Sequence, residues 1–343
     1  MSTKGKEPIP LRKPNVIVRV RPLATEGGHS ADDPPVFKKL TSWVDGVGVV
    51  LEEPGRPSRS QGDRQQKYTF ARCILGPEAT QEEVYGQSTK DLVHDFVSNG
   101  YNGLVFAYGQ TGSGKTHTIF GHESSWQDAR HEQAGIFPRA VLQIFAALES
   151  RAADTAFVLT ASAMEFYMCE CTDLLSDNAQ CFIGDDRTPI GLVAVPLTCP
   201  EDCIAFMETC RAKRTSRATL MNAAGGGHQG SSRSHCSLIL TLRTVGKDSG
   251  KCMKTALHIM DLAGAERPTK AGYDASSAVQ AVMDYWRGKP ITVGGQGFIV
   301  NYELSALRTG VVQATEQHKK HKPLVIPKAM GTSFYEYAAG CFP

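Results

Sequence analysis

The segment GQTGSGKT at residues 109–116 has the residue types and spacing that bind a nucleotide polyphosphate. It satisfies the pattern G-x-x-x-x-G-K-[ST], in which glycines let backbone N–H groups approach phosphate oxygens without obstruction by a Cβ. In this pattern Lys115 bridges the β- and γ-phosphates, and the hydroxyl of Thr116 is a Mg²⁺ ligand. A glycine-rich turn with a chance lysine is the alternative. The expected nucleotide-binding residues of this loop are Gly109, Gln110, Thr111, Gly112, Ser113, Gly114, Lys115 and Thr116.

Two further segments carry groups that could respond to a γ-phosphate. HIMDLAGAE at residues 258–266 places Asp261 at the end of an apolar run, with Gly264 three residues later. The carboxylate can hold a water of the magnesium ion, and the glycine N–H can meet the γ-phosphate. SSRSH at residues 231–235 offers hydroxyls and Arg233 near the start of another strand. Each segment is weak support alone, whereas the ordered set predicts a triphosphate site with Mg²⁺.

The elements that must position these segments alternate between strand and helix patterns. Residues 103–108 (GLVFAY) lead directly into the glycine-rich loop, as a strand buried on both faces would, and a helix is expected to begin near Ser113. A capping box, Thr80 with Glu83, should open another helix. Strands are expected over residues 15–21, 156–168, 236–245 and 255–260, and helices over residues 79–97, 136–151, 200–222 and 303–317. This order predicts an α/β fold of the P-loop NTPase kind, with a central, mostly parallel β-sheet and helices on both faces.

Composition limits the class of protein. The 343 residues are 41% hydrophobic and 21% charged, with a net charge of +2, so the chain is neither a disordered acidic tail nor a histone-like polycation, and we expect no nucleic-acid partner. No apolar run approaches the about 18 residues of a membrane span. The ten cysteines include no C-x-x-C pair, which favours reduced thiols over zinc ligands or disulfides. We interpret residues 1–14 as a flexible tail and residues 15–343 as one domain.

Taken together, these segments resemble the motor domain of the kinesin family over roughly residues 15–330. RVRP at residues 19–22 is similar to the family's adenine-site motif, and YNGLVFAYGQTGSGKTHT at residues 101–118 is close to its phosphate-loop region. SSRSH resembles switch I and DLAGAE resembles switch II. LSAL at residues 304–307 resembles part of the microtubule-binding helix.

The resemblance implies roles for individual residues. Arg19, Pro22 and His117 would lie around the adenine ring. Mg²⁺ would be held by Thr116, by Ser232 and, through water, by Asp261. Arg233 and Glu266 would form a latch that closes only around the γ-phosphate. The catalytic residues implied are Lys115, Ser232, Arg233, Gly264 and Glu266.

The function implied is that of a kinesin-type ATPase, which couples Mg-ATP hydrolysis to movement or state-dependent binding on microtubules. No guanine-specific N-K-x-D motif follows, which is consistent with adenine. Such a protein would act in the cytoplasm on the microtubule cytoskeleton, and any oligomerisation would use regions outside this chain. HKKHK at residues 318–322 supplies a basic cluster, Lys319, Lys320 and Lys322, for the acidic surface of tubulin. Taken alone, the same lysines are also typical of a solvated helix end.

Several positions depart from the family pattern. AAGGGHQG separates Asn222 from the serines of switch I, and residues 284–300 are interpreted as an insertion. Tyr302 and Glu303 replace a usual Lys-Ser, which would place a negative charge where tubulin approaches. We recognise no counterpart of the family's C-terminal strand, last helix and neck linker before Pro343.

These departures keep other functions open. The main alternative is a non-motile nucleotide-binding structural or regulatory module derived from a kinesin motor. An unrelated P-loop ATPase is less favoured, because it would not explain the adenine-site and switch I segments together.

Overall fold

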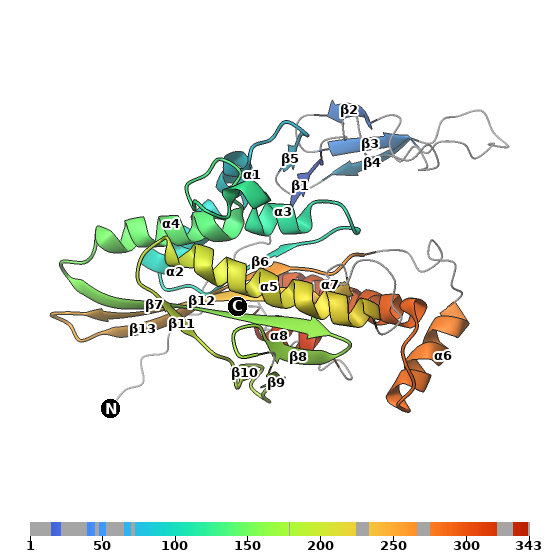
Figure 1. The fold of residues 1–343 in the computed structure, drawn as a ribbon. Helices are drawn as coiled ribbons and strands as arrows, with labels where there is room; N and C mark the ends of the chain where they lie inside the picture. The colour runs from blue at the N-terminus through green and yellow to red at the C-terminus, as the bar shows by residue number, and fades with distance from the viewer. Residues whose placement is uncertain are drawn as a thin grey trace.

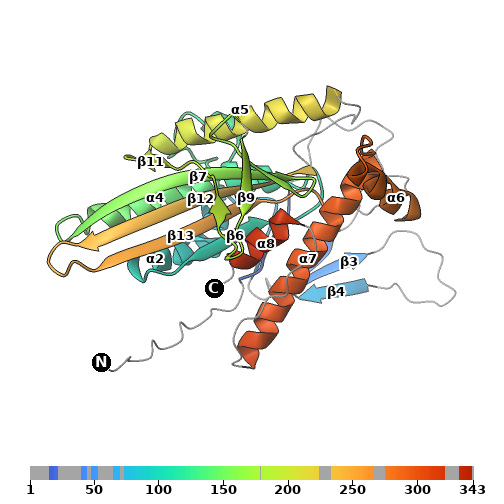
Figure 2. The same cartoon turned by 90° about the horizontal axis from the view of Figure 1, so that it is seen from below.

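The computed structural model describes residues 15–21, 40–44, 48–52, 65–69, 73–177, 179–223, 233–265, 275–320 and 332–341. A central eight-stranded sheet lies between two layers of helices. Helices α1 to α5 cover one face (Figure 1), and α7 and α8 lie across the other, which faces the viewer in Figure 2. The expected α/β fold with helices on both faces is confirmed.

The strands form three sheets in the described part of the chain. The strands of the central sheet are β6 (Gly103–Ala107), β7 (Thr155–Tyr167), β8 (Glu170–Asp173), β9 (Gln180–Ile183), β10 (Pro189–Ile190), β11 (Val195–Leu197), β12 (His235–Gly246) and β13 (Cys252–Asp261). The other sheets are the parallel pair β1 (Ile17–Arg19) and β5 (Cys73–Leu75), and the antiparallel set β2 (Leu40–Val44), β3 (Gly48–Glu52) and β4 (Gln65–Thr69).

The helices connect these strands along the chain. They are α1 (Gln81–Ser88), α2 (Lys90–Ser98), α3 (Lys115–Phe120), the short 3₁₀ helix η1 (Glu123–Ser125), α4 (Ile136–Glu149), α5 (Asp202–Ala223), α6 (Ala275–Trp286), α7 (Val293–Lys319) and α8 (Ser333–Gly340). We find no helix among the described residues with the length and apolarity that a membrane span requires.

The direction of the central strands decides where a site can form. The strand order is β10-β9-β8-β7-β12-β13-β6, in which β6 pairs in parallel with β13, and β12 runs antiparallel to both β13 and β7. The core strands β6, β13 and β7 share one direction, but β12 lies between β7 and β13 and runs against them. Among the described strands of the central sheet, only the pair β6–β13 is parallel, so the sheet is mixed. The connection from β12 to β13, residues 247–251, is too short for a parallel crossover. As a result, the ends of β6 and β13 and the beginning of β12 meet at one edge.

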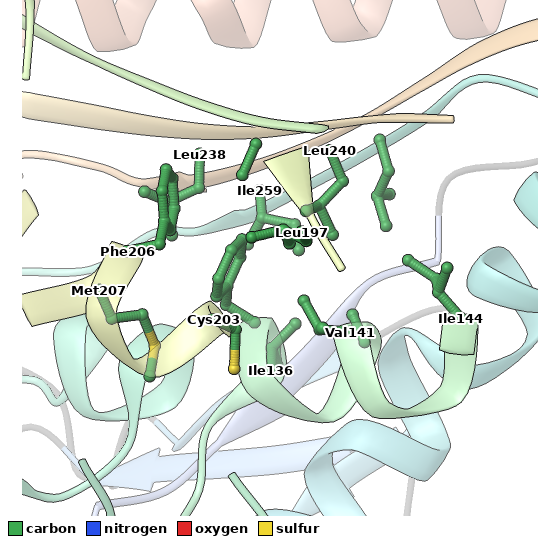
Figure 3. Packing of buried hydrophobic residues seen from close by; sticks show 14 of the residues in the cluster. Ile136, Val141, Ile144, Leu197, Cys203, Phe206, Met207, Leu238, Leu240 and Ile259 are labelled. Carbon is green, nitrogen blue, oxygen red and sulfur yellow. The ribbon is translucent and has the colours of Figure 1, made fainter. Parts of the chain in front are cut away.

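Both faces of the sheet are buried, and β12 shows how its side chains are divided between them. Leu238, Leu240 and Leu242 point into the cluster beneath α2, α4 and α5, where Phe206 of α5 also packs (Figure 3). Ile239 points to the opposite face and joins a second cluster with residues of α7 and α8. This alternation follows the two-residue period of a strand.

Some boundaries differ from those expected from the sequence. The capping box forms as expected, since Thr80 Oγ1 accepts from Glu83 N (3.1 Å) and Glu83 Oε2 accepts from Thr80 N (2.8 Å). The single helix expected over residues 79–97 is instead divided at Thr89 into α1 and α2. Likewise, α7 begins at Val293, ten residues before the expected start, because burial of its first turns outweighs the poor helix propensity of their glycines.

A buried histidine links β13 to the helical layer on the second face. His258 Nδ1 is 2.6 Å from the hydroxyl of Tyr337 in α8, and that hydroxyl is 2.8 Å from Ser237 Oγ on β12. Burial lowers the pKa of His258 from 6.5 to about 4. The imidazole is therefore neutral in the folded protein at neutral pH.

This burial makes stability depend on pH with a definite sign. The unfolded chain takes up a proton on His258 below its ordinary pKa of 6.5, whereas the folded chain resists uptake until about pH 4. The neutral imidazole therefore imposes no loss of unfolding free energy above pH 6.5, and unfolding free energy is lost as the pH falls from 6.5 toward 4. Between pH 7.5 and pH 5, His258 should account for about 2 kcal/mol of lost unfolding free energy. Urea titrations at pH 7.5 and pH 5 measure this loss. The unfolding free energy of His258→Gln should fall by about that much less between the two pH values, while the control His94→Gln, at an exposed residue, should lose as much as the wild type. Equal falls in all three proteins would contradict this assignment.

Candidate nucleotide site

The glycine-rich loop lies between β6 and α3, as the sequence predicts. Gly112 and Gly114 have φ values of 75° and 92°, in the left-handed region that favours glycine. The ammonium group of Lys115 donates to the carbonyl oxygens of Gly109 and Gln110, both at 3.0 Å. Arg21, which follows β1, donates to the carbonyl oxygen of Gly112. Two cationic side chains therefore hold the loop at its carbonyl oxygens.

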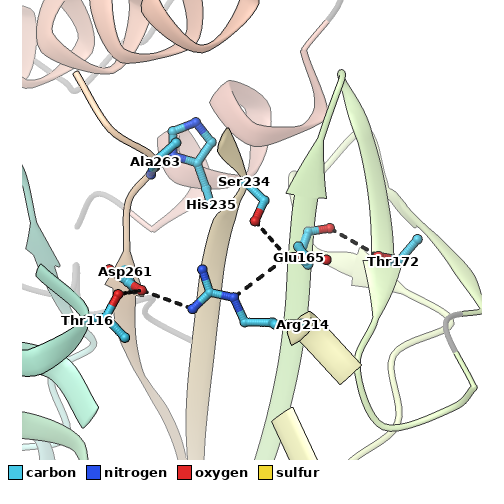
Figure 4. A network of polar contacts seen from close by, with 8 residues as sticks. All are labelled: Thr116, Glu165, Thr172, Arg214, Ser234, His235, Asp261 and Ala263. Carbon is cyan, nitrogen blue, oxygen red and sulfur yellow. Dashed lines mark hydrogen bonds and ion pairs between the residues drawn. The ribbon is translucent and has the colours of Figure 1, made fainter. Parts of the chain in front are cut away.

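Asp261 is the carboxylate around which the loop and the sheet meet. It is the last residue of β13 and only 2% exposed. Its Oδ2 accepts from the hydroxyl of Thr116 in α3 (2.8 Å) and from a guanidinium nitrogen of Arg214 in α5 (3.0 Å), as Figure 4 shows. The predicted metal-site residues Thr116 and Asp261, which are 145 positions apart, are thus brought into direct contact.

Arg214 is a residue of this site that our sequence reasoning missed. Its Nε is 3.6 Å from Glu165 Oε1 on β7, and the same oxygen accepts from Ser234 Oγ (2.6 Å) of the SSRSH segment. Burial lowers the pKa of the guanidinium, but the nearby Cys236, Asp261 and Glu165 outweigh burial and raise it above its ordinary value. Arg214 therefore stays charged. It joins the end of β13 to β7 and, through Glu165, to Ser234 just before β12.

A signal for Arg214 does exist in the sequence. The buried apolar residues of α5 include Cys203, Met207 and Cys210, and Arg214 continues their helical spacing. A charged residue on such an apolar stripe must be paired when it is buried. Its partners cannot be read from the sequence, because they lie on other elements.

Two of the residues predicted to surround adenine, Arg19 and His117, lie near each other around α3. Arg19 donates to Gln81 Oε1 (3.0 Å) and to Thr118 Oγ1 (2.9 Å), and Gln81 Nε2 donates to the carbonyl oxygen of His117 (2.8 Å). Burial and then the positive charge of Arg19 lower the pKa of His117, which favours a neutral ring. Gln81 was not predicted, and Pro22 lies outside the described residues.

The structure describes only part of the two switch-like segments, residues 233–235 of SSRSH and residues up to 265 of DLAGAE. The N–H of Ala265, next to the buried Gly264, donates to the carbonyl oxygen of Gly109 (3.1 Å), so the DLAGA segment lies against the loop. Arg233 donates to Gln296 Oε1 of α7 (2.6 Å). Ser232 and Glu266 lie outside the described residues, so the latch between Arg233 and Glu266 stays a prediction.

The expectation that Glu303 directs a negative charge outward is wrong. Glu303 is 2% exposed, and its Oε2 is 3.3 Å from His235 Nε2, because it lies on the face of α7 that packs on the sheet together with Leu304 and Leu307. Tyr302, by contrast, is 43% exposed.

The basic cluster lies at the far end of the same helix. Lys319 ends α7 and the exposed Lys320 follows it, while Lys322 lies outside the described residues.

The residues of the site fit a nucleotide with Mg²⁺. Asp261 Oδ1 is buried and has no hydrogen-bond partner among the described residues, next to the hydroxyl of Thr116. Carboxylate and hydroxyl oxygens are ligands that Mg²⁺ accepts, together with substrate phosphates and water. Within the described part of the chain, no group of three or more His, Cys, Asp or Glu residues could hold a metal unaided. A magnesium ion here would therefore depend on the phosphates of a nucleotide.

Comparisons with known proteins agree on one family. The kinesin motor domain family model matches residues 19–283. Kinesin-like protein Klp61F of Drosophila melanogaster is 37% identical over 235 residues, which cover 64% of this chain and 21% of that protein. Kinesin heavy chain of Neurospora crassa is 30% identical over 280 residues, which cover 80% of this chain and 27% of that protein. The chain thus spans about a quarter of the length of these curated relatives. A solved structure of a fast kinesin, 23% identical, has the same fold with a TM-score of 0.62, covering 96% of this chain and 91% of that chain.

Removal of Arg214 should destabilise the protein strongly. Arg214→Met would leave Asp261 and Glu165 buried without their cation, at a cost of about 3–5 kcal/mol. The matched control is Arg211→Met on the same helix, where the side chain is 51% exposed. The control should cost less than about 1 kcal/mol. Urea denaturation measures both, and similar losses in the two variants would contradict the assigned role of Arg214.

Proposed function

This chain belongs to the kinesin motor domain family, and we propose that it is a Mg²⁺-dependent ATPase that couples hydrolysis to movement or state-dependent binding on microtubules. Kinesin motors are in general ATPases that bind microtubules, and the proposal extends both properties to this chain. The observation that supports it most is the hydrogen bond between Thr116 and Asp261, because it brings the phosphate loop and the DLAGA segment to one edge of the sheet.

The loop residues would bind the phosphates. Residues 109–116 would direct backbone N–H groups at the β-phosphate, and the ammonium group of Lys115 would exchange its two carbonyl acceptors for β- and γ-phosphate oxygens. Thr116 and Asp261, with Ser232, would hold Mg²⁺, which when bound offsets charge on the phosphates. The N–H of Gly264 would meet the γ-phosphate.

Three residues would bind the base. The neutral ring of His117 offers an apolar face to adenine, and the hydrogen bonds of Arg19 to Gln81 and Thr118 fix the wall beside it. Pro22 would close the opposite side. These contacts involve a flat ring and an apolar edge, as binding of a purine requires.

The response to the γ-phosphate would lie in the two switch-like segments. Arg233 and Glu266 would form a latch that is complete only when both segments are closed, which also positions the attacking water. Ser232, Arg233, Gly264 and Glu266 are therefore the proposed catalytic residues besides Lys115. A two-state element of this kind is biased by whichever nucleotide is bound.

Microtubule contact is proposed at the end of α7. Lys319, Lys320 and Lys322 would face the acidic surface of tubulin, and burial of Glu303 removes the repulsion expected there. The protein would then act in the cytoplasm on the microtubule cytoskeleton. The alternative, a module that binds ATP without coupling it to microtubules, predicts ATP binding with no stimulation by microtubules.

The first test is Lys115→Ala. We expect ATP hydrolysis, with and without microtubules, to fall by about 10²-fold or more, because one charged phosphate contact is lost at the transition state. The matched control, Lys251→Ala, alters an exposed lysine in the β12–β13 connection at the opposite end of the sheet and should retain wild-type rates. Full hydrolysis by Lys115→Ala would rule out the proposed catalytic site.

The second test concerns the basic cluster. Replacing Lys319, Lys320 and Lys322 together by alanine should raise the Kd for microtubules about tenfold and weaken its dependence on salt, while basal ATP hydrolysis is unchanged. The control replaces Lys247, Lys251 and Lys254, which gives the same change in charge at the other end of the sheet. Co-sedimentation at several salt concentrations measures both. Equal weakening by the two triple variants would show that only net charge matters.

A further inference from the structure

Two cysteines of the central sheet have their sulfur atoms in contact. Cys171 on β8 and Cys181 on β9 lie directly opposite each other on antiparallel strands. Each residue is 2% exposed, and the two Sγ atoms are 2.8 Å apart, in hydrogen-bond contact as thiols. Because a disulfide bond is about 2.05 Å long, the two sulfur atoms would have to approach by only about 0.75 Å to form one.

The backbone at this position also suits a disulfide. Residues directly opposite each other on antiparallel strands have Cα atoms about 4.5 or 5.5 Å apart, depending on whether the pair exchanges hydrogen bonds. Both separations lie within the range of about 4.4–6.8 Å that is found across disulfides. The pairing continues regularly from the two cysteines to Thr172 and Gln180. A bond could therefore form without displacement of either strand.

Cys181 is the thiol of this pair that is prepared to react. The hydrogen bond from Cys171 lowers the pKa of Cys181 below its ordinary value of 9.0, although burial and the charge of Asp173 act in the opposite direction. A lower pKa increases the fraction of thiolate, which is the nucleophile in thiol chemistry. By contrast, burial raises the pKa of Cys341, in the same buried cluster, to about 12. We therefore expect Cys181 to be oxidised first, with Cys171 as the adjacent second thiol.

Access to Cys181 depends on local opening of the hairpin that β9 and β10 form. Cys181 is the only buried residue within residues 179–190, all of which the structure describes. Phe182 and Ile190, which face each other across the two strands, are both exposed. A segment that buries so little apolar surface opens locally at a low cost in free energy. A small oxidant can therefore reach Cys181 without unfolding of the domain.

The cysteine pair lies beneath α8, which gives its oxidation a structural consequence. Helix α8 packs against β8 and β9 (Figure 2), and Cys171 and Cys181 share a buried cluster with Tyr337 of that helix. Arg187, in the connection between β9 and β10, donates to Glu336 Oε2 of α8 (3.1 Å). A bond between β8 and β9 would close the hairpin and hold Arg187 in place against the helix.

We propose that Cys171 and Cys181 form a reversible redox site, at which hydrogen peroxide oxidises the two thiols to a disulfide that joins β8 to β9. The disulfide holds the β9–β10 hairpin closed beneath α8. Neither cysteine belongs to the candidate nucleotide site, so loss of the redox site would leave the proposed ATPase intact.

The oxidation takes place in two balanced steps. The Cys181 thiolate attacks one oxygen of hydrogen peroxide, the O–O bond breaks, and Cys181 becomes a sulfenic acid, while the departing hydroxide takes up the proton that Cys181 released. The Cys171 thiol then attacks the sulfenic sulfur, the S–O bond breaks, and the departing hydroxide takes the proton of Cys171. The two sulfur atoms lose two electrons in total, which reduce the peroxide to two molecules of water. A thiol reductant restores both thiols.

The first test maps the bond in the wild-type chain. The protein is treated with hydrogen peroxide, its remaining thiols are alkylated under denaturing conditions, and it is cleaved at aspartates, which include Asp173 and Asp177 between the two cysteines. Mass spectrometry should then find two peptides joined through Cys171 and Cys181, which dithiothreitol separates. Linkage to Cys341 instead, irreversible oxidation of Cys181, or full alkylation of both thiols would overturn the proposal.

The second test uses variants and a structural readout. Cys171→Ala and Cys181→Ala should abolish the joined peptides, whereas the control Cys169→Ala, which removes a thiol whose pKa burial raises to about 12, should retain them. In the wild type and the control, peroxide should slow hydrogen exchange in residues 180–183 by about tenfold or more, because the hairpin can no longer open. Exchange that does not change on oxidation of the wild type would overturn the proposed closure. If an alanine variant does not fold, the mapping in the wild type decides the outcome.

Discussion

The structure depends on a buried carboxylate that must be shared. Asp261 is almost fully buried, and its Oδ2 accepts from both Thr116 and Arg214. A buried charge of this kind is tolerated only when it is paired and hydrogen-bonded, so β13, α3 and α5 cannot be displaced independently. Arg214 extends the constraint through Glu165 to Ser234, which places the SSRSH segment within the same network. The candidate nucleotide site is therefore assembled by the electrostatics of the core as much as by the loop that would contact the phosphates.

The direction of the strands explains why this network can exist. β6 and β13 end at the same edge of the sheet, and β12 begins there because it runs antiparallel to β13. Open α/β sheets bind ligands at the carboxyl ends of their parallel strands, where connecting loops converge. Because β12 is antiparallel to them, it begins at the edge where β6 and β13 end. Ser234 and His235, at the start of β12, therefore lie at this edge, whereas in an all-parallel sheet only residues at strand ends would lie there. The mixed sheet therefore brings the SSRSH segment, as well as the glycine-rich loop, to the site.

The sequence correctly predicted those features that are determined by residues close together in the chain. The loop at residues 109–116 and the capping box of Thr80 depend on neighbours in the chain, and both are formed as predicted. The contacts of Arg214 and Glu303 could not be predicted, because each depends on partners in elements distant along the chain. The same reason explains the error at Glu303. A glutamate in a helix is most often exposed, and its buried position beside His235 depends on an element that is distant along the chain.

Burial of Glu303 also changes what the two ends of α7 can contribute. An outward carboxylate would have opposed the acidic surface of tubulin in the proposed microtubule contact, while contributing nothing to the interior. Facing inward, it meets His235 and leaves the outward position to the uncharged Tyr302. The negative charge thus lies beside the buried imidazole of His235, while Lys319 and Lys320 lie where the helix ends. One helix can then be held by polar contacts at the nucleotide side and attracted by charge at its far end, without either interaction weakening the other.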